Sequence, residues 1–571
     1  MRRLLFTMFV FVLVLTGFSQ YTHSWGTYYG GTRRDELHAI AVSGEDAVYA
    51  AGWSQSDGAG VISTTSAHQV NRGSTSTSSS GRDGMLVKFN GAGVRQWATY
   101  YGGNQEDQVL AIATDAAGNV YIAGKTLSGG GIATTGSHKS STFSADAFLV
   151  KFNANGVRQW GTYYGSQFQP EEGSALAIDA TGNVYLAGMA TGSSEGVATP
   201  GAHQTTIGAQ TDAFLVKFNA DGVRQWGTFY GGGGNDFATG LSTDPQGNVI
   251  LCGYTNSSTN IATAGSHQPA QGSASDDGFI VKFNTNGQRL WGTYYGGTGV
   301  DFAYSIKADA QSNLYVAGTT QSNSGIATAG SHQSAKGGTT LDADAFLLKL
   351  DANGSRLWAT YYGAAGSDGA LAVAVSSAGS VAIAGGSNSA GVIATANGFQ
   401  TSVGGNGLPT DGYAAVFNTD GTRQYGTYYG GGFDDNSTAI AFTPTGALLM
   451  VGRTLSTGSA LATAGAHQAS FNGDVNSASS AFYDGFVVKF SSATAGPTSY
   501  TFTGSGAWSN AANWQGGTAP PATIPTGVSI VISPNGTDEC VIDIPVTFAA
   551  GSSLQVAAGK RLRITAGLTV Q

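Results

Sequence analysis

The sequence predicts an all-β fold, a seven-bladed β-propeller of four-stranded blades followed by a small, β-rich, solenoid-like C-terminal module. The phrase WGTYYGG, or a close variant, and the phrase DAFLVKF each occur seven times. Glycine is abundant, at 87 of 571 residues, while proline is scarce, at 12, which fits many short strands joined by tight turns. A repeat of this kind predicts units that pack on their neighbours to form one array.

Each repeat contains four apolar segments in a fixed order. In the second complete repeat they are residues 111–115, 120–124, 147–152 and 158–165. Glycine-containing turns of the type Asp-x-x-Gly-Asn and Asn-x-Asn-Gly join the first pair and the last pair of segments, and such turns close β-hairpins. The copies of the two phrases begin at Trp25, Trp97, Trp160, Trp226, Trp291, Trp358 and Tyr425, and at Asp83, Asp146, Asp212, Asp277, Asp344, Asp411 and Asp484.

The ends of the array predict that it closes into a ring. The first WGTYYGG segment, at Trp25, has no AFLVKF segment before it, and the last DAFLVKF-type segment ends at Phe490 with no WGTYYGG after it. We expect residues 25–30 to form the outermost strand of the blade that contains residues 486–490. Closure of this kind removes both exposed sheet edges.

These phrases carry a resemblance to a known family. The motifs DxxGNVYxAG and WGTYYGG resemble the SBBP-type β-propeller repeats of secreted bacterial proteins, and the likeness covers about residues 25–490. The resemblance implies the propeller fold but no general biochemical activity. Blade six departs from the pattern, since Phe399 replaces a histidine, Val416 replaces a lysine and residues 376–380 replace DxxGN.

The segments outside the repeats complete the predicted organisation. Residues 1–19 have a basic start, a short apolar run and small residues at the end, as in a secretory signal peptide, so we expect a secreted or cell-surface protein. No later segment resembles a membrane span. Residues 20–490 form the predicted propeller, 491–499 a linker, and 500–571 the C-terminal module, which we expect to be incomplete.

The amino-acid composition limits the kinds of binding partner that are expected. The formal net charge is −9 and basic runs are absent, so a nucleic acid is not an expected partner. Cys252 takes a position where other repeats mostly have alanine, and we expect it to be a buried free residue that forms no disulfide with Cys540.

Recurring lysines and tryptophans have structural interpretations. The lysine of each AFLVKF phrase is expected to extend along a blade edge, and the tryptophan of each WGTYYGG phrase to pack between blades. Exposed aromatic rings that stack on sugars are the alternative for the WGTYYGG residues.

Acids and histidines recur on the rim that carries the long connection between the second and third strands, which we expect to be the functional rim. Each histidine of the IATxGxHQ phrase is predicted to hydrogen-bond an acid of its own blade, for instance His138 with Asp107 or Asp146. The alternative is a metal or acid-base site in each blade. Repetition favours the structural interpretation, and no catalytic, cofactor or metal residue is predicted. The rim residues are Asp35, His68, Asp107, His138, Glu172, His203, Asp236, His267, Asp301, His332, Asp435 and His467, with Glu171 beside Glu172 and Asp368 in blade six.

Three classes of function remain. We expect a binding or scaffold protein that presents the loops of one rim to an extracellular glycan, a protein or the cell envelope, rather than an enzyme. An extracellular polysaccharide lyase or glycosidase acting in the central funnel needs acids or bases that are not repeated. A structural spacer of a larger adhesin is the third class.

Overall fold

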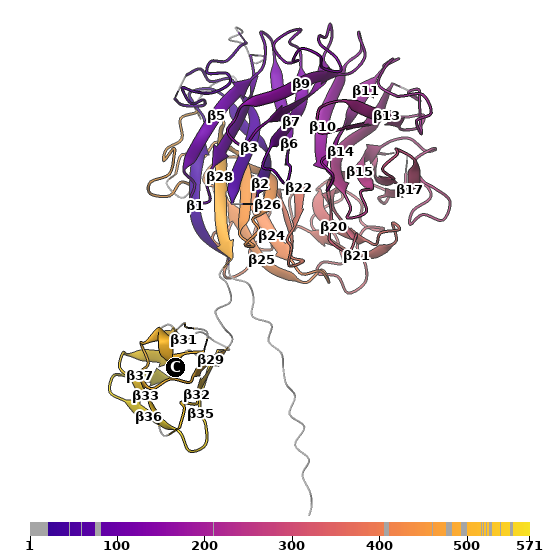
Figure 1. The fold of residues 1–571 in the computed structure, drawn as a ribbon. Coiled ribbons are helices and arrows are strands. Elements are labelled where there is room, and N and C mark those ends of the chain that lie inside the picture. Colours follow the sequence, from indigo (N-terminus) through magenta and orange to yellow (C-terminus); the bar gives the residue numbers. More distant parts are fainter. Residues whose placement is uncertain are drawn as a thin grey trace, which may run out of the picture. The chain divides into compact units, whose positions relative to one another are not determined.

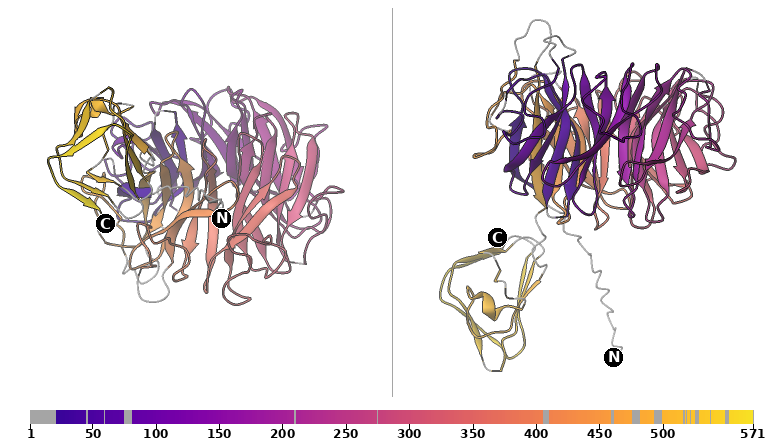
Figure 2. Two further views of the ribbon diagram at one scale, coloured as in Figure 1. Left: turned by 90° about the horizontal axis from the view of Figure 1, so that it is seen from below. Right: turned by 45° about the horizontal axis from the view of Figure 1, so that its top comes forward.

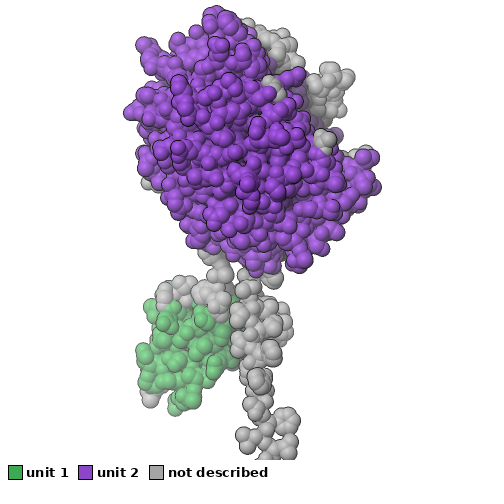
Figure 3. Space-filling view, turned by 90° about the vertical axis from the view of Figure 1, so that its right-hand side faces the viewer, with its two compact units in different colours: residues 1–20, 493–571 green, residues 21–492 purple. Residues whose placement is uncertain are grey.

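A computed structural model describes residues 21–570, apart from 45, 59, 75–80, 209, 274, 405–409, 459–460, 475–481, 493–498, 516, 518, 521, 525–527, 537 and 549–551. The chain divides into two compact units, of which one is Tyr21–Ser492 and the other contains Ala493–Gln571; Figure 3 colours them separately. The signal-peptide prediction for residues 1–19 lies outside the described residues. No helix of the described residues is long and apolar enough to cross a membrane.

The first unit is a ring of seven four-stranded antiparallel sheets, as the repeats predict (Figures 1 and 2). Blades one to three are β2 (Asp35–Ser43), β3 (Ala47–Ser54), β4 (Asp83–Phe89) and β5 (Arg95–Tyr101); β6 (Asp107–Thr114), β7 (Val120–Thr126), β8 (Asp146–Phe152) and β9 (Arg158–Tyr164); and β10 (Glu171–Ile178), β11 (Val184–Thr191), β12 (Thr211–Phe218) and β13 (Arg224–Tyr230).

Blades four to seven continue this order. Their strands are β14 (Asp236–Thr243), β15 (Val249–Thr255), β16 (Asp277–Phe283) and β17 (Arg289–Tyr295); β18 (Asp301–Ala308), β19 (Leu314–Thr320), β20 (Asp344–Leu350) and β21 (Arg356–Tyr362); β22 (Asp368–Val375), β23 (Val381–Ser387), β24 (Asp411–Phe417) and β25 (Arg423–Tyr429); and β26 (Asp435–Phe442), β27 (Leu448–Thr454), β28 (Asp484–Ser492) and β1 (Tyr21–Tyr29).

The two ends of the repeat array meet in blade seven. Strand β1 pairs antiparallel with β28, so that Trp25 lies opposite Lys489 and Tyr28 opposite Phe486. Figure 1 shows the indigo β1 beside the orange β28. The predicted closure is confirmed, and it leaves the seventh sheet with the same four strands as the other six.

The first strand of each blade lies at the centre of the ring and contacts the first strands of both neighbouring blades. The buried apolar residues of the propeller form seven clusters, each shared between neighbouring blades. A blade therefore buries its two faces against its neighbours, and none of these seven clusters lies within a single blade.

A polar clasp joins neighbouring blades at the rim of the tight hairpins. Trp97 Nε1 and Lys88 Nζ of blade one both donate to the carbonyl of Ala154 in the last hairpin of blade two, each at 3.0 Å. The same hairpin needs Gly156, because its φ is +77° and a Cβ there would lie 2.9 Å from the Trp97 ring. The other clasps join Trp160 and Lys151 to Ala220, Trp226 and Lys217 to Thr285, Trp291 and Lys282 to Ala352, Trp358 and Lys349 to Thr419, and Trp25 and Lys489 to Gly91.

The clasp also explains why blade six lacks the recurring tryptophan and lysine. Its neighbour, blade seven, has no hairpin between its last two strands, because these strands are the two ends of the array. A tryptophan and a lysine in blade six would therefore have no hairpin carbonyl to donate to. Tyr425 and Val416 take their places. The Tyr425 ring instead packs against Tyr21 at 5.1 Å, and Phe399 lies 4.4 Å from His23 of β1.

The second unit is a short parallel solenoid, which agrees with the β-rich module expected from the sequence. Three sheets of parallel strands, β29-β32-β35, β30-β33-β36 and β31-β34-β37, surround a core that contains Trp508, Trp514 and Phe502. Its elements are β29 (Ser499–Phe502), β30 (Gly506–Ala507), the 3₁₀ helix η1 (Ala511–Asn513), β31 (Thr523–Ile524), β32 (Ser529–Ile532), β33 (Glu539–Ile542), β34 (Val546–Phe548), β35 (Ser553–Val556), β36 (Arg561–Ile564) and β37 (Leu568–Val570).

Removal of the closing strand tests the ring. Deletion of residues 20–31 exposes the edge of β28 and leaves Tyr28 and Tyr29, both buried, out of the core. We expect a lower melting temperature for the whole propeller, measured by calorimetry on residues 20–492 with and without this segment. Equal melting temperatures would contradict closure as a source of stability.

Candidate functional site

The acid that begins the first strand of each blade is a buried structural group. In blade five, the Asp301 carboxylate accepts hydrogen bonds from the backbone N–H of Gly297, at 2.8 Å, and from Ser322 Oγ, at 2.7 Å, and also from Thr320. It thereby joins the WGTYYGG turn to the end of the second strand. The corresponding serine partners in the other blades with aspartate are Ser56, Ser128, Ser257, Ser389 and Ser456.

The aspartate that begins the third strand holds the long loop. Asp344 accepts hydrogen bonds from the N–H of Gly337, at 2.8 Å, and from Gln333 Nε2, at 3.1 Å. Gln333 is the residue after the recurring histidine, and its Oε1 accepts from the N–H of Gly363 in the WGTYYGG turn. The glutamine therefore bridges two loops. The equivalent glutamines are Gln69, Gln204, Gln268, Gln400 and Gln468.

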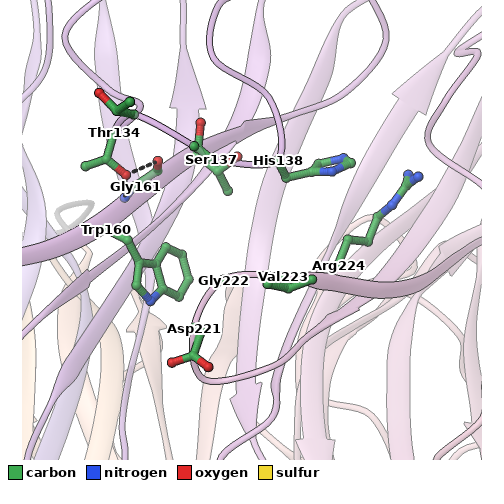
Figure 4. A pocket seen from close by; sticks show the side chains of 12 residues that line it. Thr134, Ser137, His138, Trp160, Gly161, Asp221, Gly222, Val223 and Arg224 are labelled. Atoms are coloured by element: carbon green, nitrogen blue, oxygen red, sulfur yellow. Dashed lines mark hydrogen bonds between the residues drawn. The ribbon is translucent and has the colours of Figure 1, made fainter.

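The recurring histidines lie among aromatic rings, which differs from their predicted pairing with acids. The His138 ring lies 5.9 Å from Tyr164 of its own blade and 6.0 Å from Phe218 of the next. Burial lowers the pKa of His138 to about 4, and Arg224 and Lys139 add to this effect. Arg224 lies on the His138 side of a pocket whose other wall contains Asp221 and Trp160 (Figure 4). The hydrogen-bond partners found for Asp107 and Asp146 are other groups, so the imidazole is a neutral packing element between blades.

The same packing recurs for most of the histidines of the predicted set. His68, His203, His267, His332 and His467 each lie beside the tyrosine that occupies the position of Tyr164, and burial lowers the pKa of each imidazole. In the part of the chain that the structure describes, no group of three or more histidine, cysteine, aspartate or glutamate side chains is placed to hold a metal ion.

Blade three requires a second correction. Glu171, rather than Glu172, occupies the position of the first-strand aspartate, where it is fully buried and accepts a hydrogen bond from Ser194 Oγ at 2.6 Å. Glu172 is half-buried, with its carboxylate 4.0 Å from Lys125 Nζ of blade two. The sequence alone could not separate two adjacent glutamates, because strand pairing decides which of them faces the interior.

Two buried carboxyl groups meet at each junction between blades. A Cβ on Gly296, in the WGTYYGG turn, would lie 2.7 Å from Asp301 Oδ2 and 2.9 Å from Asp277 Oδ1. Burial raises the pKa of Asp277 to about 7, and the Asp301 charge adds to the rise. At the closing junction, burial raises the pKa of Asp484 to about 8, with a further contribution from Asp35.

Residues that do not repeat lie at the mouth of the central channel, the end where the first strands begin and the long loops connect. The residue after each first-strand acid differs from blade to blade: Glu36, Gln108, Glu172, Phe237, Phe302, Gly369 and Asn436. In blades four and five these positions contribute to an aromatic group of Phe237, Tyr254, Phe302 and Tyr304. The centroids of successive rings in this order lie 4.8, 4.6 and 5.8 Å apart, and all four side chains are half-buried.

A charged group lies on the other side of the mouth, in blades one, two and seven. Glu36 Oε2 is 3.5 Å from His38 Nε2 and 3.2 Å from Arg453 Nη1. Arg82 lies 4.3 Å above the Trp53 ring and pairs with Glu106 at 3.3 Å. Burial lowers the pKa of His38, while the Glu36 charge opposes this shift. The mouth thus combines aromatic faces with acids, bases and hydrogen-bond donors.

Apart from Glu172, the mouth residues were not predicted from the sequence, and neither were the glutamines, because the prediction used recurring histidines and acids. The signal for the glutamines was present in blade six, where Gln400 remains although Phe399 replaces the histidine. The mouth could have been recognised from variation instead, because the position directly after each recurring acid differs from blade to blade.

The buried carboxyl of Asp484 predicts a pH-dependent stability. The folded chain retains this proton up to about pH 8, while the unfolded chain releases it near pH 4, so the folded form binds more protons between these values. Stability from this group therefore falls as the pH rises from 4 to 8. Asp484→Asn lacks this loss, and its melting temperature relative to wild type should rise between pH 5 and pH 8. A constant difference would show that Asp484 is ionised in the folded chain.

Comparisons with known proteins agree with the fold. A family model of the SBBP β-propeller repeat matches residues 96–131 and 290–325. The chain is 24% identical over 430 residues to an uncharacterised WD repeat-containing protein of Acanthamoeba polyphaga mimivirus, which covers 64% of this chain and 30% of that protein. It is 28% identical over 145 residues to the regulatory protein FlaEY of Caulobacter vibrioides, covering 25% and 15%.

The chain thus spans less than a third of the length of these curated relatives. Among solved structures, the WD40 β-propeller domain of Doa1 aligns with a TM-score of 0.40 and 8% identity, covering 84% of this chain and 98% of that chain. With seven four-stranded blades and two matches to the family model, the chain is a seven-bladed β-propeller that carries SBBP-type β-propeller repeats.

Proposed function

We propose that the chain is a secreted or cell-surface binding protein whose channel mouth binds an extracellular glycan. The observation that carries this proposal is the aromatic group of Phe237, Tyr254, Phe302 and Tyr304. These rings are half-buried and lie at the rim that carries the long loops. The equivalent positions of the other five blades hold no phenylalanine, tyrosine or tryptophan apart from Trp53.

The chemistry of the mouth suits a sugar. Aromatic faces bind the apolar C–H faces of pyranose rings, and neighbouring charged and amide groups bind hydroxyls or carboxylates. The side chains that recur in every blade have structural partners, whereas the residues at the mouth differ from blade to blade. The apolar run of residues 4–15 near the N-terminus supports export from the cytoplasm.

Calorimetric titration of the full chain with laminarin, xylan and alginate tests the proposal. We expect at least one polysaccharide to bind, and Tyr254→Ala to weaken that binding about three- to tenfold through the loss of one stacking surface. Leu357→Ala is the control, because Leu357 is a 50% exposed apolar residue of the outermost strand β21 and lies in none of the long loops. Absence of binding, or equal weakening by both substitutions, would contradict a glycan site at the mouth.

A polysaccharide lyase or glycosidase is the second candidate. The unrepeated arrangement of Glu36, His38 and Arg453 favours it. Arg453 donates to the Glu36 carboxylate at 3.2 Å and His38 Nε2 lies 3.5 Å from it, and an acid, an imidazole and a guanidinium so close together can transfer protons and stabilise an anion. The same titrations distinguish the two functions when the mixtures are analysed for shortened chains. Cleavage that Glu36→Gln abolishes, with binding retained, would identify an enzyme. Binding without cleavage supports the binding protein.

A further inference from the structure

The lower part of the central channel contains a single break in an otherwise small and uncharged ring of side chains. The residue six positions after each first-strand acid is alanine in five blades and serine in one, while blade five has Lys307. Register confirms the equivalence, since Lys307 lies opposite Tyr315 just as Ala113 lies opposite Tyr121 and Ala177 opposite Tyr185. The full ring is Ala41, Ala113, Ala177, Ser242, Lys307, Ala374 and Ala441.

Lys307 lines two cavities of the channel, of about 310 and 150 Å³. Both also contain Ile40, Ile112, Leu176 and Ile440, so they are successive parts of one apolar passage. The larger volume is at the lower end of the range for small-molecule sites, roughly 300–1,000 Å³. Its other walls are mainly aliphatic side chains and alanines, with Thr114, Ser242 and Thr243 as hydroxyl groups.

These hydroxyl groups already have backbone partners. Thr114 donates to the carbonyl of Val42, Thr243 donates to that of Ile178, and Ser242 Oγ accepts from the N–H of Ala308. The polar contribution of the walls to a ligand therefore comes chiefly from Lys307.

The Lys307 ammonium has no opposite charge beside it in the described part of the chain. The ion pairs of these residues do not include Lys307. Its side chain is exposed to the interior of the channel, and desolvation by the surrounding protein lowers the pKa of the ammonium. The nearby Cys252 thiol is neutral, because burial raises its pKa to about 12. An ammonium in such surroundings is stabilised by a bound anion.

We propose that the channel is a binding site for a small monocarboxylate with an apolar body, whose carboxylate pairs with Lys307 Nζ. One cation matches one negative charge, whereas a phosphate or sulfate dianion would leave a second charge uncompensated between apolar walls. The aliphatic side chains bury the apolar body of the ligand. This site lies deeper than the mouth, although its smaller cavity is also lined by His38 and Tyr304. Its test uses a different ligand and different variants from the test of the glycan site.

Calorimetric titration with octanoate tests the site in the full chain. We expect one octanoate to bind per chain, and Lys307→Ala to weaken binding about tenfold or more by removing a charge-assisted hydrogen bond. Alanine at this position should fold, since five blades carry it, and the melting temperature checks this. Lys125→Ala is the control, because this half-exposed lysine lines neither cavity, and it should bind octanoate as wild type does.

Octan-1-ol and inorganic phosphate are the comparison ligands, and both should bind more weakly than octanoate because each lacks one half of the required chemistry. Octanoate should also slow acetylation of Lys307 by an N-hydroxysuccinimide ester, read by mass spectrometry, but not acetylation of the half-exposed Lys125. The proposal is overturned if Lys307→Ala binds octanoate as tightly as wild type does, or if octan-1-ol binds wild type as tightly as octanoate does. It is also overturned if octanoate slows the acetylation of both lysines equally.

Discussion

The fold depends on the attachment of each blade to the next, because a four-stranded blade cannot bury its own faces. The recurring tryptophan and lysine donate to one carbonyl of the neighbouring hairpin, and the hairpin glycine allows the indole ring to approach. A carbonyl oxygen has two lone pairs, so two donors can share it. Each complete repeat therefore contains both the two donors, tryptophan and lysine, and a hairpin carbonyl that accepts from the preceding blade. Successive blades can be joined by the same contact around the ring.

Most of the fold was predictable, and the site was predictable only in part. Repeated phrases and the unmatched strand at Trp25 determine blade number and closure, since a ring of identical units has few ways to satisfy its edges. The partners of the acids were not predictable in the same way. Asp344 has both a histidine and a glutamine nearby in the sequence, and only the path of the long loop brings Gln333 to it and His332 to an aromatic ring.

Residues that recur in the blades and residues that occur in one blade have different explanations in this protein. The acids, glutamines, histidines, lysines and tryptophans recur because every junction between blades has the same requirements. Blade six supports this view, as it loses its clasp residues where the hairpin of its neighbour is absent. The mouth residues and Lys307 have no such requirement, since the equivalent positions of other blades hold small or unrelated side chains. A ligand that contacts the channel meets different chemistry on each side of it.

A double-mutant cycle on one clasp tests most directly whether these recurring residues hold the blades together. Trp160→Phe and Lys151→Met each remove one donor to the Ala220 carbonyl, and Lys125→Met removes a half-exposed lysine outside the clasp. Calorimetric unfolding of residues 20–492 should show one transition. The free energy of unfolding should fall by about 1 kcal/mol or more in each clasp variant, with non-additive losses in the double variant and little change for Lys125→Met. Clasp variants as stable as wild type would contradict this account of the fold.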